Sequence, residues 1–220
     1  METVKINYSN ALGAAAFMRA IAFAAALGMA AFPAATQTAV PQPAAPQTAI
    51  ERMQEPGPEA QRLARRAGVW NVVITLRPTP DATPIVSKDL IAERAMVGLF
   101  LQEIIRPAPG SPGPDFRRIS YLTYNRVEGR WQYVSLDTRF PAGIMPAYSV
   151  DKGRDDTIEL QFESLAFAGW GKNVDGWMMR SNYVAMLRDV DRETAQQYWT
   201  RADGSGVRWL AVQYEYTRQH

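Results

Sequence analysis

The sequence predicts an all-β protein, an antiparallel barrel or sandwich of roughly ten short strands. Three observations support this. Segments rich in β-branched and aromatic residues follow one another from residue 69 to residue 217, turns containing glycine or aspartate separate them, and most intervals are too short for a helix. Strands without intervening helices are typical of antiparallel sheets rather than βαβ units. We favour a barrel, because closure removes exposed strand edges.

The first residues of the chain predict export. An apolar stretch over residues 21–31 follows Arg19 and precedes small residues, the pattern of a secretory signal peptide. This stretch is short for a membrane span, although an uncleaved anchor is the alternative. We assign residues 1–34 to the signal peptide, suspect Met18 as the true initiator, and expect a periplasmic or secreted protein.

Residues 35–58 are dense in Pro, Ala, Gln and Thr, which predicts a semi-extended linker. Such a segment buries too little apolar area to offset its ordering entropy. The folded domain, residues 59–220, then begins with an amphipathic helix over residues 59–67, between Pro58 and Gly68. We interpret the cluster of Arg62, Arg65 and Arg66 as a solvated face of this helix.

The predicted strands then follow in close succession, with a hairpin in the middle. They cover residues 69–76, 88–96, 99–106, the hairpin at 116–140, and then 147–151, 157–164, 182–188, 194–201 and 207–217. Turns are expected at residues 151–153 and 203–206, where aspartate and glycine occur together. We interpret Met178 and Met179 as part of a flexible apolar loop at the mouth of the barrel.

The hairpin at residues 116–140 is the most informative stretch, and Gly129 in its turn suits a left-handed backbone. The two favoured pairings differ by two residues, so both leave the same side chains on each face. One face holds Arg118, Ser120, Leu122, Tyr124, Trp131, Tyr133, Ser135 and Asp137. We expect this face to point inward, because Ile119, Val134 and Leu136 on the other face suit packing against Leu63 of the 59–67 helix.

Composition argues against several classes of site. The chain has no cysteine, so it has no disulfide, thiolate metal site or cysteine nucleophile. Its one histidine is the terminal His220, which disfavours serine–histidine triads, multi-histidine metal sites and haem held by a proximal histidine. The net charge of +2 is well below the clustered positive charge expected of a nucleic-acid binder. We therefore expect no metal, no cofactor, no nucleic-acid partner and no stable membrane insertion after signal cleavage.

Several motifs together resemble one bacterial family. They are Ala67-Gly68-Val69-Trp70, the run at residues 92–103, Tyr124-Asn125, Trp131, Leu136-Asp137 and the closing run at residues 213–218. Their order and spacing resemble the domain-of-unknown-function family 1579, small and often exported proteins thought to be lipocalin-like. The resemblance spans residues 59–218, implies a lipocalin-like barrel and supplies no catalytic residues. Members usually have Gly-Thr-Trp where this chain has Gly68-Val69-Trp70, and commonly a histidine where it has Ala60.

The inward face of the hairpin carries the candidate ligand-binding residues Arg118, Tyr124, Trp131, Tyr133 and Asp137. Arg118 and Asp137 are expected opposite each other, as a polar anchor beside a ligand. The alternative is an ordinary cross-strand ion pair, worth about 0.2–1 kcal/mol. The three aromatic side chains are expected either to stack on an apolar ligand or to fill the core.

Other acidic residues carry weaker signals. Paired carboxylates for acid–base chemistry are one interpretation of Glu93, Glu103, Glu159 and Glu163, but a role in surface solubility explains them better. The run from Asp189 to Glu193 lacks the glycine and the bidentate ligand of a calcium loop.

Three functions remain open. The favoured one is an exported lipocalin-like protein that binds a small apolar or amphipathic molecule. The second is an enzyme that acts on such a molecule inside the barrel, with tyrosine and carboxylate groups in place of histidine. The third is an envelope interaction protein with a filled barrel. A cavity separates the first two from the third, and a buried carboxylate with a raised pKa favours the enzyme.

Overall fold

The computed structural model describes residues 47–140, 142–154, 156–167 and 175–220, so the predicted signal peptide lies outside it. The described chain begins with helices α1 (Ala49–Gln54) and α2 (Pro58–Ala64) and continues in strands. These are β1 (Gly68–Leu76), β2 (Ile85–Val97), β3 (Phe100–Pro107), β4 (Arg118–Asn125), β5 (Arg130–Asp137), β6 (Met145–Tyr148), β7 (Thr157–Phe162), β8 (Leu165–Ala166), β9 (Met178–Leu187), β10 (Arg192–Arg201) and β11 (Trp209–Arg218).

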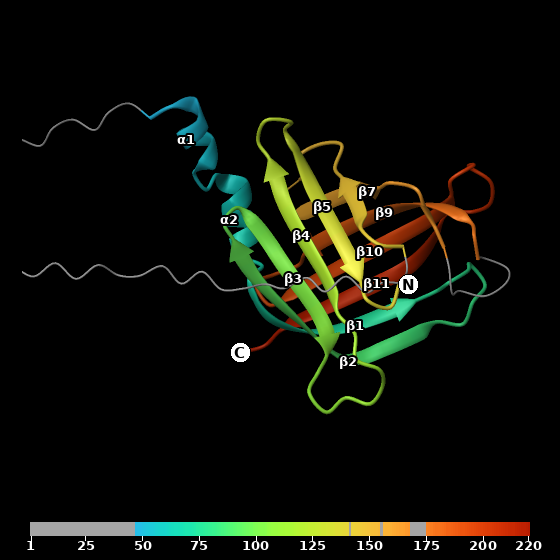
Figure 1. Ribbon diagram of the computed structural model, residues 1–220. Helices are drawn as coiled ribbons and strands as arrows, with labels where there is room; N and C mark the ends of the chain where they lie inside the picture. The colour runs from blue at the N-terminus through green and yellow to red at the C-terminus, as the bar shows by residue number, and fades with distance from the viewer. Residues whose placement is uncertain (1–46, 141, 155, 168–174) are drawn as a thin grey trace, which may run out of the picture. The chain divides into compact units, whose positions relative to one another are not determined.

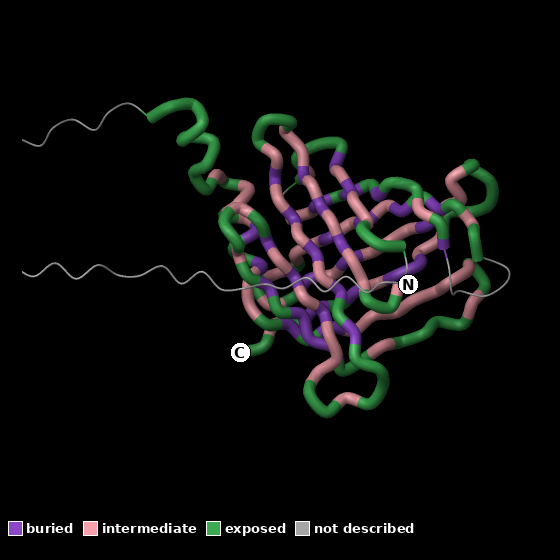
Figure 2. Tube along the Cα trace, in the orientation of Figure 1, coloured by how far each residue is buried: buried purple, intermediate pink, exposed green. Residues whose placement is uncertain are grey.

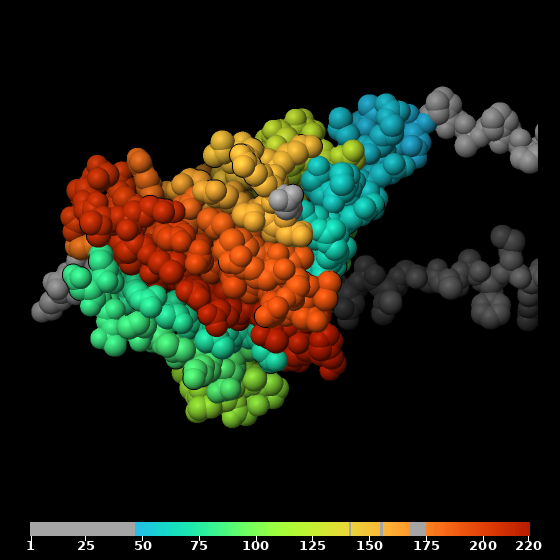
Figure 3. All heavy atoms as spheres, turned by 180° about the vertical axis from the view of Figure 1, so that it is seen from behind, coloured from blue at the N-terminus to red at the C-terminus, as the bar shows by residue number. Residues whose placement is uncertain are grey.

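The strands form one antiparallel sheet that closes into a barrel (Figure 1). Neighbouring strands follow the order β10-β11-β1-β2-β3-β4-β5-β6-β7-β9, and pairing of β9 with β10 completes the circle. Within the described ranges, the short β8 pairs with β9 alone. Seen from behind, the first strands lie directly beside the last ones, as the pairing of β1 with β11 requires (Figure 3). The predicted antiparallel barrel is therefore confirmed.

The hairpin of β4 and β5 shows how sequence alternation positions the interior. Arg118 pairs with Asp137 and Asn125 pairs with Arg130, and Gly129 in the turn has a φ of 70°. Every second residue of β4, beginning with Arg118, is buried, and the residues between are half-exposed. The same alternation continues around the barrel (Figure 2). The predicted inward face is therefore confirmed, and both registers considered from sequence would have given it.

Helix α2 covers one end of the barrel, where Leu63 is fully buried among the interior side chains (Figure 1). The prediction that this helix packs outside the wall, against Ile119, Val134 and Leu136, is wrong. The helix contacts β2, β3 and β4, and Arg62 donates to the Thr157 carbonyl. A helix across the end buries Leu63 more completely than a helix lying on a half-exposed wall.

The linker prediction is also wrong over part of its length, because residues 49–54 form α1. Thr48 caps this helix through a reciprocal capping box with Glu51, which satisfies two backbone N–H groups at the helix start. Arg126 in the β4–β5 turn donates to the carbonyls of Arg52 and Glu55 at the other end. Among the described residues, no helix has the length and apolar character needed to cross a membrane.

The largest strand error concerns residues 178–181. Met178 and Met179, expected in a flexible loop, open strand β9, and Met179 is fully buried. Met179 pairs with Leu165 of β8 on one side and Arg201 of β10 on the other. The two neighbouring strands stabilise an extended backbone that the local glycine content had disfavoured.

Candidate functional site

The barrel interior has two halves of different character. In the half nearer α2, side chains from Leu63, Trp70 and Trp131 are fully buried and fill the space. In the other half a cavity of about 400 Å³ lies among the strands. This volume falls within the range of small-ligand pockets, about 300–1,000 Å³.

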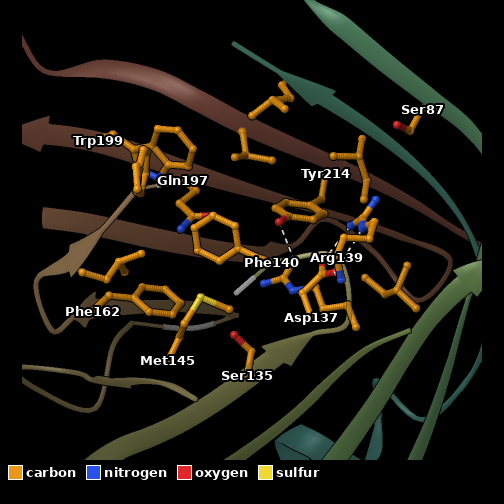
Figure 4. Close-up of a pocket in the computed structure, with 17 residues that line it drawn as sticks. Ser87, Ser135, Asp137, Arg139, Phe140, Met145, Phe162, Gln197, Trp199 and Tyr214 are labelled. Carbon is orange, nitrogen blue, oxygen red and sulfur yellow. Dashed lines mark hydrogen bonds and ion pairs between the residues drawn. The ribbon is translucent and has the colours of Figure 1, made fainter. Parts of the chain in front are cut away.

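Apolar side chains form most of the cavity wall (Figure 4). The apolar lining is Ile74, Leu76, Ile105, Phe140, Met145, Phe162, Leu165, Phe167, Trp199, Val212 and Tyr214, and the polar lining is Ser87, Arg118, Ser135, Asp137, Arg139 and Gln197. Phe167 packs edge-on against Trp199, with ring centroids 4.2 Å apart. The lining runs from the buried Arg118 to the exposed Arg139. A largely apolar wall with a few polar groups is typical of sites for small amphipathic molecules.

Arg118 is the buried charge of the cavity. Its guanidinium donates one hydrogen bond to the Tyr214 hydroxyl, drawn as a dashed line in Figure 4, and another to the Tyr133 hydroxyl at 3.1 Å. The guanidinium also lies over the Tyr214 ring, 4.9 Å from its centroid. Among the described residues, no carboxylate lies within ion-pair distance of Arg118.

Asp137 lies opposite Arg118 in the strand pairing, as predicted, but its side chain bonds elsewhere. Arg139 donates to both carboxylate oxygens of Asp137, at 3.0 and 2.7 Å. Burial raises the pKa of Asp137, but the hydrogen bonds and charge of Arg139, together with the charge of Arg118, outweigh burial and hold that pKa below its usual value. The predicted direct Arg118–Asp137 pair is therefore replaced by an Asp137–Arg139 pair, because the second arginine reaches the carboxylate from the strand end.

The predicted aromatic residues divide between the two halves. The Tyr133 hydroxyl reaches Arg118, and its ring stacks on Tyr183 with centroids 6.0 Å apart. Tyr124 and Trp131 pack against each other beneath α2, with the Trp131 indole donating to the Lys152 carbonyl at 2.7 Å. None of the three predicted aromatic residues is part of the cavity lining. Of the predicted site, the structure brings together Arg118, Tyr133 and Asp137.

Ser135 adds a polar group that sequence analysis placed on the inward face but did not select. It is 1% exposed and lines the cavity, and its side chain is directed toward the interior (Figure 4). Among the described residues its hydroxyl has no hydrogen-bond partner. A buried hydroxyl without a partner carries a desolvation cost, so a ligand or water in the cavity would stabilise it.

The α2 end holds a buried ionic network. Arg94 donates to Glu103 at 2.7 Å and to both oxygens of Glu193 at 3.0 and 3.1 Å, while Arg66 lies 3.6 Å from Glu193. Burial raises the pKa of Glu193, but the charges of Arg94 and Arg66 outweigh burial and lower that pKa. The surface interpretations of Arg66 and Glu103 are therefore wrong. Strand alternation carried the missed signal, since Arg94, Glu103 and Glu193 share parity with buried apolar neighbours.

Most of the cavity wall was also missed, because it comes from strands and loops far from the hairpin. Tyr214 and Trp199 are buried on β11 and β10, and their in-phase apolar neighbours are the signal that could have placed them inside. Phe140 belongs to a predicted loop, where alternation gives no guide. Across the described ranges, no group of three acidic or histidine side chains is arranged to hold a metal ion.

Comparison with solved structures supports the fold. The crystal structure of Rv2717c from M. tuberculosis aligns with a TM-score of 0.51 and 18% sequence identity, over 74% of this chain and 99% of that chain. At this identity the similarity concerns the fold alone. No protein-family model matches the sequence, and a search of curated proteins finds no match. The resemblance to the domain-of-unknown-function family 1579 stays a prediction.

Proposed function

We propose that this protein binds a small amphipathic molecule inside its barrel. The observation that carries the proposal is the cavity of about 400 Å³ with aromatic walls and a buried arginine. Apolar surface removed from water supplies the affinity, at about 25 cal/mol per Å², and the polar groups set the orientation. The cavity favours ligand binding over a filled barrel.

The same cavity favours binding over acid–base catalysis. Asp137 is the carboxylate among the described lining residues, and its pKa is lowered by Arg139 despite burial. A general acid near neutral pH needs the opposite shift. Asp137 therefore stays ionised and paired, which suits a wall residue better than a proton donor.

Fluorescence titration with the neutral apolar probe N-phenyl-naphthylamine tests the proposal. We expect the protein to bind the probe at micromolar concentration, which corresponds to about 8 kcal/mol of binding free energy. Val212→Phe extends a wall side chain into the cavity and should abolish binding. Val184→Phe makes the same change on the half-exposed outer face of β9 and should leave binding intact. Equal binding by both variants, each shown to be folded by circular dichroism, would place the probe elsewhere and contradict the proposal.

We also infer that the chain is an exported bacterial protein, which rests on the apolar stretch after Arg19. Amino-terminal sequencing of protein from the host's periplasm should begin between residues 31 and 40. Intact Met1 in the soluble cytoplasmic fraction would contradict this inference.

A further inference from the structure

We propose that the ligand is a monoanionic amphiphile whose carboxylate binds at Arg118 and whose apolar tail extends toward the mouth of the barrel. This inference rests on the proposed function and adds the charge, the head group and the orientation of the bound molecule. Its basis is the combination of a buried cation, unused hydrogen-bond donors around it and a net positive lining.

Arg118 is a buried cation. Arg118 is 7% exposed, and arginine is not deprotonated in proteins, so a full positive charge lies inside the barrel. Buried charges in proteins are normally paired, because the desolvation of a lone charge costs several kcal/mol. Among the described residues, the hydrogen-bond partners of Arg118 are the neutral hydroxyls of Tyr133 and Tyr214. Burial, which outweighs the opposing effect of Arg118, raises the pKa of Tyr214, so at neutral pH Tyr214 is not a phenolate counter-ion.

Unused hydrogen-bond donors lie near Arg118. Each tyrosine oxygen accepts a hydrogen bond from the guanidinium, which leaves each O–H proton free to donate. Neither hydroxyl donates to another group within the described part of the chain, and of the two tyrosines Tyr214 lines the cavity. Ser135 contributes a third O–H without a partner, and the guanidinium has N–H groups left over. An arrangement rich in donors around a cation is complementary to an oxyanion rather than to a protonated amine, which has only donors and a positive charge.

The charged residues of the cavity lining indicate a ligand with one negative charge. The described cavity lining contains the cations Arg118 and Arg139 and the anion Asp137. Asp137 and Arg139 neutralise each other through their paired hydrogen bonds, which leaves the single charge of Arg118. A carboxylate balances that charge, whereas a phosphate monoester, with a charge of about −1.5 to −2 at pH 7, leaves negative charge in an apolar cavity.

The positions of the aromatic residues set the orientation. Arg118 and Ser135 are buried, while Phe140, Leu165 and the exposed Arg139 lie toward the strand ends away from α2. A head group bound at Arg118 therefore places the tail among Phe162, Phe167 and Trp199. The ligand enters with its carboxylate first.

Isothermal titration with a matched series tests this proposal: decanoate, decanol, decylamine and decyl phosphate. The protein should bind decanoate tightest, decanol more weakly and decylamine weakest. Arg118→Met should weaken decanoate binding by about 10- to 100-fold, the loss expected for a hydrogen-bonded charge, and leave decanol binding nearly unchanged. Tyr214→Phe, which keeps the ring, should weaken decanoate binding about tenfold or less. Arg117→Met removes the same charge from the exposed neighbouring position and should have no effect.

The outcomes separate this proposal from the proposed function. Equal affinity of the parent protein for decanoate and decanol, with N-phenyl-naphthylamine still bound, would overturn the anion site and keep the cavity. Tighter binding of decyl phosphate than of decanoate would overturn the charge count. Equal losses from Arg118→Met and Arg117→Met would assign the preference to general surface charge, and overturn the site as well. No binding of any probe would contradict the proposed function itself.

Discussion

The two halves of the barrel interior bury arginine in opposite ways. Near α2, Arg94 and Arg66 lie against the carboxylates of Glu103 and Glu193, so two cations meet two anions. In the cavity half, Arg118 contacts tyrosine hydroxyls and no described carboxylate lies at ion-pair distance. The balanced half has little free space and the unbalanced half has a cavity of about 400 Å³. The difference indicates that one half stabilises the barrel and the other is built to receive a ligand.

The largest expected effect comes from a substitution in the half of the interior nearer α2. Trp131→Ala should destabilise the protein by about 3–5 kcal/mol, since the fully buried indole leaves a cavity and the Lys152 carbonyl loses its donor. Urea unfolding measures the loss. The affinity of the folded fraction for N-phenyl-naphthylamine should be unchanged, because Trp131 does not line the ligand cavity. Weaker probe binding by fully folded Trp131→Ala protein would mean that the two halves are not separate.

A second change breaks the charge balance. Glu193→Gln should cost about 3 kcal/mol, because removal of one partner leaves Arg94 and Arg66 with a single carboxylate between them. Glu215→Gln on the exposed face of β11 is the matched control and should have little effect in the same urea titration. A Glu193→Gln protein as stable as the Glu215→Gln protein would show that the network contributes nothing to the fold.

The pH dependence of stability should follow from the same carboxylate. Arg94 and Arg66 lower the folded-state pKa of Glu193 despite burial, so below its ordinary value near 4.5 the unfolded chain binds more protons than the folded one. The contribution of Glu193 is therefore complete above that pH and is lost as the pH falls through the lowered pKa. Urea unfolding across this acidic window should show a smaller decline for Glu193→Gln than for the parent protein. Parallel declines would assign the acid sensitivity to other carboxylates.

The sequence predicts which side chains point into the barrel, but not how far along the barrel axis they lie. Direction was predictable, since side chains alternate strictly along a strand and a shift of two residues does not change the face. Arg118, Tyr124, Trp131, Tyr133 and Asp137 therefore all point inward as expected. Depth along the barrel axis was not predictable, because it depends on which end α2 covers, a tertiary contact without a local signal. Tyr124 and Trp131 consequently lie under α2 and not beside the ligand cavity.

The charged interior was missed for a different reason. Charged side chains are mostly exposed in proteins, so Glu103 and Arg66 were assigned to the surface. Their burial depends on a network that also needs Glu193, which pairs with Arg66 and with Arg94 and lies 99 residues beyond Arg94 in the chain. A pairing of that range exists only once the barrel has closed. The strand alternation does place Arg94 and Glu193 at inward-facing positions. Their burial could not be predicted from alternation alone, because the partner that neutralises each charge was not known.

The smallest expected effect sharpens the comparison most. Arg118→Met should change the stability of the ligand-free protein by about 1 kcal/mol or less, because the lost tyrosine hydrogen bonds are offset by removal of an unpaired buried charge. Arg94→Met, the same substitution in the balanced half, should cost about 3–5 kcal/mol, because it leaves Glu103 and Glu193 buried with Arg66 as their remaining cation. Urea unfolding of both variants without ligand measures the contrast.

Decanoate should then make the Arg118→Met protein clearly less stable than the parent protein. A ligand that binds only the folded state raises stability in proportion to the logarithm of its concentration over Kd, so the 10- to 100-fold weaker binding of Arg118→Met should make its gain from decanoate smaller than that of the parent protein by about 1.4–2.7 kcal/mol. Arg94→Met should keep the full decanoate-dependent gain, since its cavity half is intact. If Arg118→Met instead loses as much stability as Arg94→Met without ligand, the tyrosine contacts of Arg118 hold the fold together. The missing carboxylate beside it would then no longer indicate a ligand.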